Sequence, residues 1–194
     1  MNKLRIAIIG AGQFSSSFIH LFQAHPMVQE VGLVEPNNER RVAISAQFNI
    51  KQSFDSLEKL WGSDFNAVAI FTPRWTHAQI ALEALNNGRH VYTAVPMGIT
   101  HEEVTQLVDV ASKTKLTYFM AETSYYYPAV VFSRQKFASG QMGSFVYGEG
   151  EYLHDMSHGF SDAYAANGGD EWKSTASFSA HAYLGIQWCG RRND

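Results

Sequence analysis

A glycine-rich stretch, GAGQFS, occupies residues 10–15 and has the residue types that bind the phosphates of a dinucleotide. In such a loop the first glycine forms a tight turn, and the second lets the backbone approach the pyrophosphate. Gly10 and Gly12 take these positions, and Ser15 takes the third, where a serine packs slightly less well than glycine. An ordinary strand-to-helix turn has the same pattern, so the surrounding elements must decide.

An acidic residue, Glu35, follows 23 residues after Gly12, at the end of the apolar run VGLVE. A carboxylate at this point accepts hydrogen bonds from the ribose hydroxyls of the adenosine half of a dinucleotide. It also repels a ribose 2′-phosphate, so Glu35 favours NAD, whereas Arg40 and Arg41 leave NADP as an alternative. The other interpretation of Glu35 is a solvated residue in a turn.

The elements around these residues alternate between buried strands and helices. Helical spacing of apolar residues, and a capping box at Thr100 and Glu103, mark the helices. The pattern predicts strands at 4–10, 28–34, 67–71, 90–93 and 117–121, and helices at 14–24, 38–48, 55–61, 76–85 and from 100 onward. This order indicates an α/β fold, a Rossmann-type doubly wound parallel sheet, with ligands at the carboxyl ends of its strands. We expect an NAD(P)-binding domain at residues 1–121 and the beginning of an α+β substrate domain at 122–194.

Composition narrows the class of protein. The chain has 194 residues, 45% of them hydrophobic, a net charge of −3 and one cysteine. Without a block of lysine and arginine, nucleic acid is not an expected partner, and no apolar stretch is long enough for a bilayer. The lone cysteine fits a reducing compartment. We therefore expect a cytoplasmic protein that associates with neither nucleic acid nor membrane.

Three stretches together resemble the Gfo/Idh/MocA oxidoreductase family: IAIIGAGQFS, FTPRWTHAQIALEALNNGRHVYTAVP and GQMGSFVYGEGEYLHD. The resemblance implies NAD or NADP as cofactor, with the turn at Thr72 and Pro73 lining its nicotinamide end and His77 starting the helix beneath it. His77 could equally be a helix residue bonded only to backbone. The cofactor-binding residues that we expect are Gly10, Gly12, Gln13, Phe14, Glu35, Thr72, Pro73, Arg74, His77, Val95 and Pro96.

The family usually carries Glu-Lys-Pro where this chain has Ala94, Val95 and Pro96. That lysine helps to move the substrate's hydroxyl proton, and a valine cannot donate, accept or titrate. The sequence thus resembles family branches with A-V-P, which include NAD-dependent glycosidases. Where such relatives place a tyrosine and a histidine, this chain has Phe178 and His181, so His181 is the predicted catalytic residue. The alternative is a histidine outside the site.

The resulting hypothesis is an NAD(P)-dependent oxidoreductase that acts on a carbohydrate or polyol by hydride transfer to or from nicotinamide C4. The alternatives are a non-catalytic dinucleotide-binding remnant or sensor, and a redox-assisted glycosidase. Spacing argues against a metal site at His154, Asp155 and His158, and we expect no metal. The aromatic residues Tyr125, Tyr126, Tyr127, Tyr164 and Trp172 could stack on a sugar or simply cover a core. Because the family's substrate domain would be incomplete here, we expect exposed apolar surface and a homo-oligomer.

Overall fold

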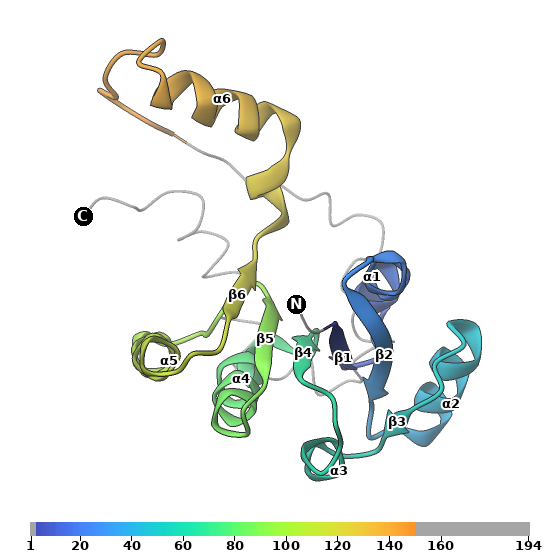
Figure 1. Ribbon diagram of the computed structural model, residues 1–194. Helices are drawn as coiled ribbons and strands as arrows, with labels where there is room; N and C mark the ends of the chain where they lie inside the picture. The colour runs from blue at the N-terminus through green and yellow to red at the C-terminus, as the bar shows by residue number, and fades with distance from the viewer. Residues whose placement is uncertain (1–2, 150–194) are drawn as a thin grey trace, which may run out of the picture. The chain divides into compact units, whose positions relative to one another are not determined.

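Continuous apolar runs form the strands of one parallel sheet in the computed structural model, which describes residues 3–149 (Figure 1). Strands buried on both faces are apolar rather than alternating, as in IAII at residues 6–9 of the first strand. The strand order is β3-β2-β1-β4-β5-β6, and every pair is parallel. The predicted Rossmann-type fold is therefore confirmed. The strands are β1 Leu4–Ile9, β2 Val28–Val34, β3 Ser53–Phe54, β4 Ala67–Ile70, β5 His90–Ala94 and β6 Tyr118–Ala121.

Helices cover both faces of this sheet. On one face, the fully buried Leu60 and Leu107 belong to the cluster packed under α3, α4 and α5. On the other, Ile19 of α1 and Ile44 of α2 pack on the strands. Burying each such side chain contributes about 1.5–3 kcal/mol. The helices are α1 Gln13–Ala24, α2 Asn38–Gln47, α3 Leu57–Trp61, α4 His77–Asn86 and α5 His101–Lys113.

The start of α5 has the predicted capping box. The Thr100 Oγ1 atom accepts a hydrogen bond from the Glu103 backbone N–H at 3.1 Å, and the Glu103 carboxylate accepts one from the Thr100 N–H at 3.1 Å. Two of the N–H groups at this helix start are thereby satisfied. The sequence therefore predicted both where this helix begins and how it is capped.

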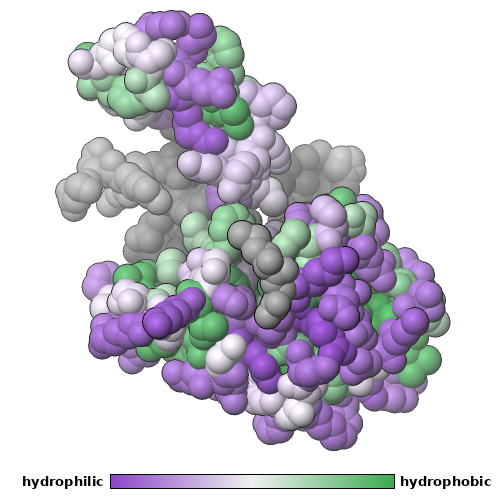
Figure 2. Space-filling view, in the orientation of Figure 1, coloured by the Kyte–Doolittle hydropathy of each residue, from purple (hydrophilic) through white to green (hydrophobic). Residues whose placement is uncertain are grey.

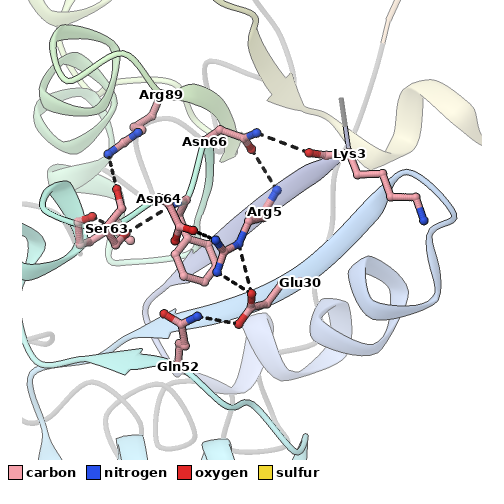
Figure 3. Close-up of polar contacts among 10 residues, drawn as sticks. Lys3, Arg5, Glu30, Gln52, Ser63, Asp64, Asn66 and Arg89 are labelled. Carbon is pink, nitrogen blue, oxygen red and sulfur yellow. Dashed lines mark hydrogen bonds and ion pairs between the residues drawn. The ribbon is translucent and has the colours of Figure 1, made fainter. Parts of the chain in front are cut away.

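A polar network ties together the amino-terminal ends of β1 and β2 (Figure 3). Arg5 donates through Nη2 to the Glu30 carboxylate at 2.6 Å, and Gln52 donates to the other oxygen of Glu30 at 3.0 Å. Arg5 also forms an ion pair with Asp64, and its backbone N–H donates to Asn66 Oδ1 at 2.9 Å. This network lies at the end of the sheet opposite the glycine-rich loop and serves the structure.

The chain divides into two units, Met1–Ala121 and Glu122–Asp194. In the described part of the second unit, a 3-10 turn, Thr123–Tyr126, leads into helix α6, Pro128–Ala138. Gly140 and Gly143, with φ of 74° and 69°, follow the helix as the sequence predicts. The alternating aromatic residues after Gly143 predict a strand over residues 144–155, but the described part, 144–149, is not a strand, and Val146 is 97% exposed. A strand requires a neighbour for its backbone groups, and periodicity cannot supply one.

The described surface is mixed in character. In the view of Figure 2, most of the visible surface of residues 3–121 is hydrophilic, with small hydrophobic patches on it. Exposed apolar side chains there include Phe14 and Leu21, at 51% and 55% exposure. Within residues 3–149, no helix has both the length and the apolar character that crossing a membrane requires.

Candidate cofactor site at the carboxyl ends of the strands

The tight turn after β1 depends on Gly10. Its φ is 95°, in the left-handed region that side chains rarely adopt. A Cβ at this position would lie 3.2 Å from the carbonyl carbon and oxygen of Phe71 and from Thr72 Cγ2. The first glycine is therefore required both by its backbone conformation and by the close approach of the chain that follows β4.

Gly12 leaves open space at the start of α1. Its backbone is extended, and a Cβ built on it would meet no atom within 4 Å. As the N-cap residue it provides no side-chain cap, and no acidic residue occupies the first turn. A helix start with these features favours an anion, because its N–H groups and the helix dipole both present positive charge. The residues present thus fit a dinucleotide pyrophosphate.

Ser15 occupies the third small position of the loop. Its side chain is fully buried, and its Oγ donates a hydrogen bond to the Gly12 carbonyl oxygen at 2.8 Å. The hydroxyl that distinguishes it from glycine is therefore satisfied within the helix start, which allows α1 to pack on the sheet.

Glu35 joins the end of β2 to the glycine-rich loop. Its Oε2 accepts a hydrogen bond from the Ala11 N–H at 3.0 Å, and its Oε1 accepts one from the Asn37 N–H at 2.9 Å. The residue is 7% exposed. Since each carboxylate oxygen has a second lone pair, the group can still accept hydrogen bonds from ribose hydroxyls. Glu35 thus shapes the loop as well as offering an acceptor.

The two arginines near Glu35 differ in what they bind. Arg41 donates to the carbonyl oxygens of Glu35 and Pro36 at 2.7 and 3.4 Å, so it fixes the backbone after β2. Arg40 lies 3.9 Å from the Glu35 carboxylate and is partly exposed. Of this pair, Arg40 is therefore the better placed to meet a ribose 2′-phosphate.

The turn after β4 is held by its own side chains. Thr76 Oγ1 donates to the Pro73 carbonyl oxygen at 2.7 Å and lies 2.7 Å from Thr72 Oγ1. Arg74 belongs to the 3-10 turn Arg74–Thr76 that leads into α4. Because Gly10 approaches Thr72 closely, this turn and the glycine-rich loop lie next to each other.

Aromatic rings support this junction. Phe14 of the loop is 51% exposed, and its ring centroid lies 5.9 Å from that of Phe71 and 4.9 Å from that of Phe18. Phe71 also contacts Tyr92 of β5, at 5.9 Å. Phe71 and Thr76 were not predicted as site residues from the sequence. Their places in the sequence could have indicated them, because Phe71 directly precedes Thr72 and Thr76 directly precedes His77.

His77 is buried between two turns. The residue is 1% exposed, with Nδ1 2.7 Å from the Pro96 carbonyl oxygen and Nε2 2.8 Å from the Thr72 carbonyl oxygen. Burial lowers the pKa of His77, although both carbonyl oxygens oppose this, and the nearby charge of Arg74 lowers it further. A neutral ring donates to one of the carbonyl oxygens, whereas an imidazolium donates to both.

The lowered pKa of His77 predicts that acid destabilises the fold. The unfolded chain, with the ordinary histidine value of 6.5, binds the proton more readily than the folded chain. The contribution of His77 is therefore present above about pH 6.5 and is lost as the pH falls below it, by at most about 1.4 kcal/mol per pH unit. Urea unfolding at several pH values should show this slope in the wild type and a smaller one in His77→Asn. A larger slope in His77→Asn than in the wild type would mean that the two carbonyl oxygens raise the pKa of His77 by more than burial lowers it.

Several predicted residues lie together and others lie outside the described part. Gly10, Gly12 and Glu35 surround the start of α1, and Thr72 adjoins them. Val95 and Pro96 follow β5, the strand next to β4, and the bond between them is cis. His181 and the residues near His154 lie outside residues 3–149. Within that range, no three histidine, cysteine, aspartate or glutamate side chains gather as they would for a metal ion.

The strand order, the open glycine at an uncapped helix start and the acid at the end of β2 define a Rossmann-type dinucleotide-binding domain. The chain belongs to the Gfo/Idh/MocA oxidoreductase family, with an NAD-binding Rossmann fold, which residues 4–122 match. The predicted family and its NAD cofactor are thereby confirmed.

Several known proteins are similar to most of this chain in sequence or structure. A glycosyl hydrolase family 109 protein of Shewanella sp. (strain W3-18-1) is 28% identical over 166 residues, covering 80% of this chain and 36% of the relative. Levoglucosan dehydrogenase, solved with NADH and levoglucosan, is 25% identical with a TM-score of 0.74, covering 80% of this chain and 44% of that one. Myo-inositol 2-dehydrogenase of Lactobacillus plantarum is 19% identical with a TM-score of 0.75, covering 96% and 56%. The chain thus spans about a third of the curated relative's length.

Proposed function

We propose that the protein is an NAD-dependent oxidoreductase that transfers hydride between a carbohydrate or polyol carbon and nicotinamide C4. The observation that carries this proposal is the fit of the open Gly12 position and the Glu35 carboxylate to NAD. Bound NAD supplies the hydride acceptor. The protein's own residues hold the pyrophosphate at the start of α1, orient the adenosine ribose and take up the substrate's hydroxyl proton.

The substrate class rests on similarity to a levoglucosan dehydrogenase and on aromatic side chains. Tyr125, Tyr126 and Tyr127 are 51, 58 and 57% exposed, and the Arg134 guanidinium lies 3.4 Å from the Tyr125 ring centroid. Exposed tyrosine rings such as those of Tyr126 and Tyr127 pack on the C–H faces of sugars, whereas Arg134 covers one face of Tyr125. A small sugar or polyol is therefore the proposed substrate, while assembly as a homo-oligomer stays a prediction.

The mechanism also needs a residue that accepts the substrate's hydroxyl proton. Val95 stands where the family's lysine usually lies, and its aliphatic side chain cannot take a proton. We propose His181 as the general base that accepts the proton while the hydride leaves. The curated relative's name, a glycosyl hydrolase, favours a second candidate, a redox-assisted glycosidase.

Fluorescence titration with NADH, followed by assays on sugars, inositols and nitrophenyl glycosides, tests the proposal. NADH binding together with sugar-dependent reduction of NAD is the expected result. Release of nitrophenol without net NADH formation would identify the glycosidase. Binding without any turnover would favour a non-catalytic remnant, and absence of NADH binding would overturn all three.

A further inference from the structure

His77 connects two turns that the sheet itself leaves unconnected. The pairing of β4 with β5 ends at Ile70 and Thr93, so neither Thr72 nor Pro96 belongs to this ladder. The His77 ring lies between their carbonyl oxygens, at 2.8 and 2.7 Å. A planar ring that is 1% exposed has little freedom to reorient. The relative position of the two turns therefore depends on this side chain.

These turns do not belong to the part of the site that would hold the adenosine half of NAD, which Thr72 adjoins through Gly10. That part is built from β1, β2 and the start of α1, where Glu35 bonds the Ala11 N–H. No hydrogen bond of His77 reaches it, because both ring nitrogens face the turns after β4 and β5. Where the turn after β4 approaches Gly10, the chain is held by the Phe71 N–H, which donates to the Ile9 carbonyl oxygen at 2.9 Å independently of His77. A change at His77 should thus act first on the nicotinamide half of the cofactor site.

We propose that His77 is a positioning residue that fixes the turns at Thr72 and at Pro96 in register, so that the nicotinamide half of NAD binds between them. This inference rests on the proposed function, because it needs NAD in this site. The imidazole contacts the two backbone carbonyl oxygens rather than the cofactor. Loss of the ring should weaken the binding of NADH and leave ADP-ribose, which lacks nicotinamide, bound as before.

The test compares NADH with ADP-ribose in the full chain, by fluorescence titration and calorimetry. In His77→Ala, we expect NADH affinity to fall about tenfold, which corresponds to the loss of one neutral hydrogen bond. ADP-ribose affinity should stay within about twofold. Leu60→Ala is the matched control, since Leu60 is equally buried but lies in α3. This control should lower the melting temperature without changing the ratio of the two affinities.

Two further variants keep the test decisive. His77→Phe keeps an aromatic ring at this position without a ring nitrogen, so it should change the ratio of the NADH and ADP-ribose affinities as His77→Ala does. It provides the same test if the alanine variant does not fold. His77→Asn places an amide nitrogen near the position of Nδ1 and should recover part of the NADH affinity. An unchanged ratio in His77→Phe, or equal weakening of both ligands, overturns the proposal. Failure of the wild type to bind NADH would instead overturn the proposed function.

Discussion

Replacing Gly12 with valine is expected to lower the affinity for NADH by at least about 100-fold while leaving the protein folded. A Cβ at this position meets no atom within 4 Å, and the extended backbone accepts any residue. The change should therefore cost the fold no more than about 1 kcal/mol, the usual effect of a poor N-cap. The isopropyl group would occupy the space above the first-turn amides that the pyrophosphate needs. NADH fluorescence titration measures the loss, and thermal unfolding confirms the fold.

Gly10→Ala is the matched control for this prediction. Its φ of 95° is strained for alanine, and the new Cβ would press on the Phe71 backbone at 3.2 Å. We expect a loss of unfolding free energy of about 1–2 kcal/mol or more, which is a stability effect rather than a selective binding effect. Unchanged NADH affinity in Gly12→Val would contradict the assignment of this loop to the pyrophosphate.

The sequence was most informative where a residue's type alone restricts the backbone. The stretch VQEVGLV at 28–34 predicted β2 with its observed bounds, and the glycine at position 10 predicted a turn that only glycine accepts. The strand β3, Ser53–Phe54, could not be predicted, because a strand of two residues has no periodicity. It exists because the backbone of β2 offers it a partner.

The partners of side chains were the least predictable part of the site. Glu35 was predicted as an acceptor for ribose hydroxyls, and the sequence could not show that both its oxygens also accept backbone N–H groups from Ala11 and Asn37. For His77, the sequence left two interpretations, and only the structure shows both ring nitrogens against carbonyl oxygens. Such contacts join residues 2 to 24 positions apart, and their geometry follows from the packing of whole elements.

Position 95 is a valine where the family usually has a lysine, so the proposed reaction needs another group to accept the substrate's hydroxyl proton. Val95 directly precedes Pro96, whose carbonyl oxygen lies 2.7 Å from the His77 ring, so the backbone of this turn is held in place. A proton acceptor is therefore missing at a point where the scaffold is otherwise formed. His181 is the residue that we propose for this role.

His181→Ala should lower the turnover of sugar or polyol by about 10²–10⁴-fold, the usual contribution of a general base, with NADH affinity nearly unchanged. The wild-type oxidation rate should also fall in acid, because a protonated imidazole cannot accept the hydroxyl proton. His101→Ala serves as the control, since His101 is an exposed residue of α5 and should leave turnover as it is. Steady-state reduction of NAD over a range of pH measures all three proteins. Full activity in His181→Ala would remove His181 from the mechanism but leave the proposed oxidoreductase activity standing. A loss confined to turnover would mean that an imidazole replaces the family's lysine.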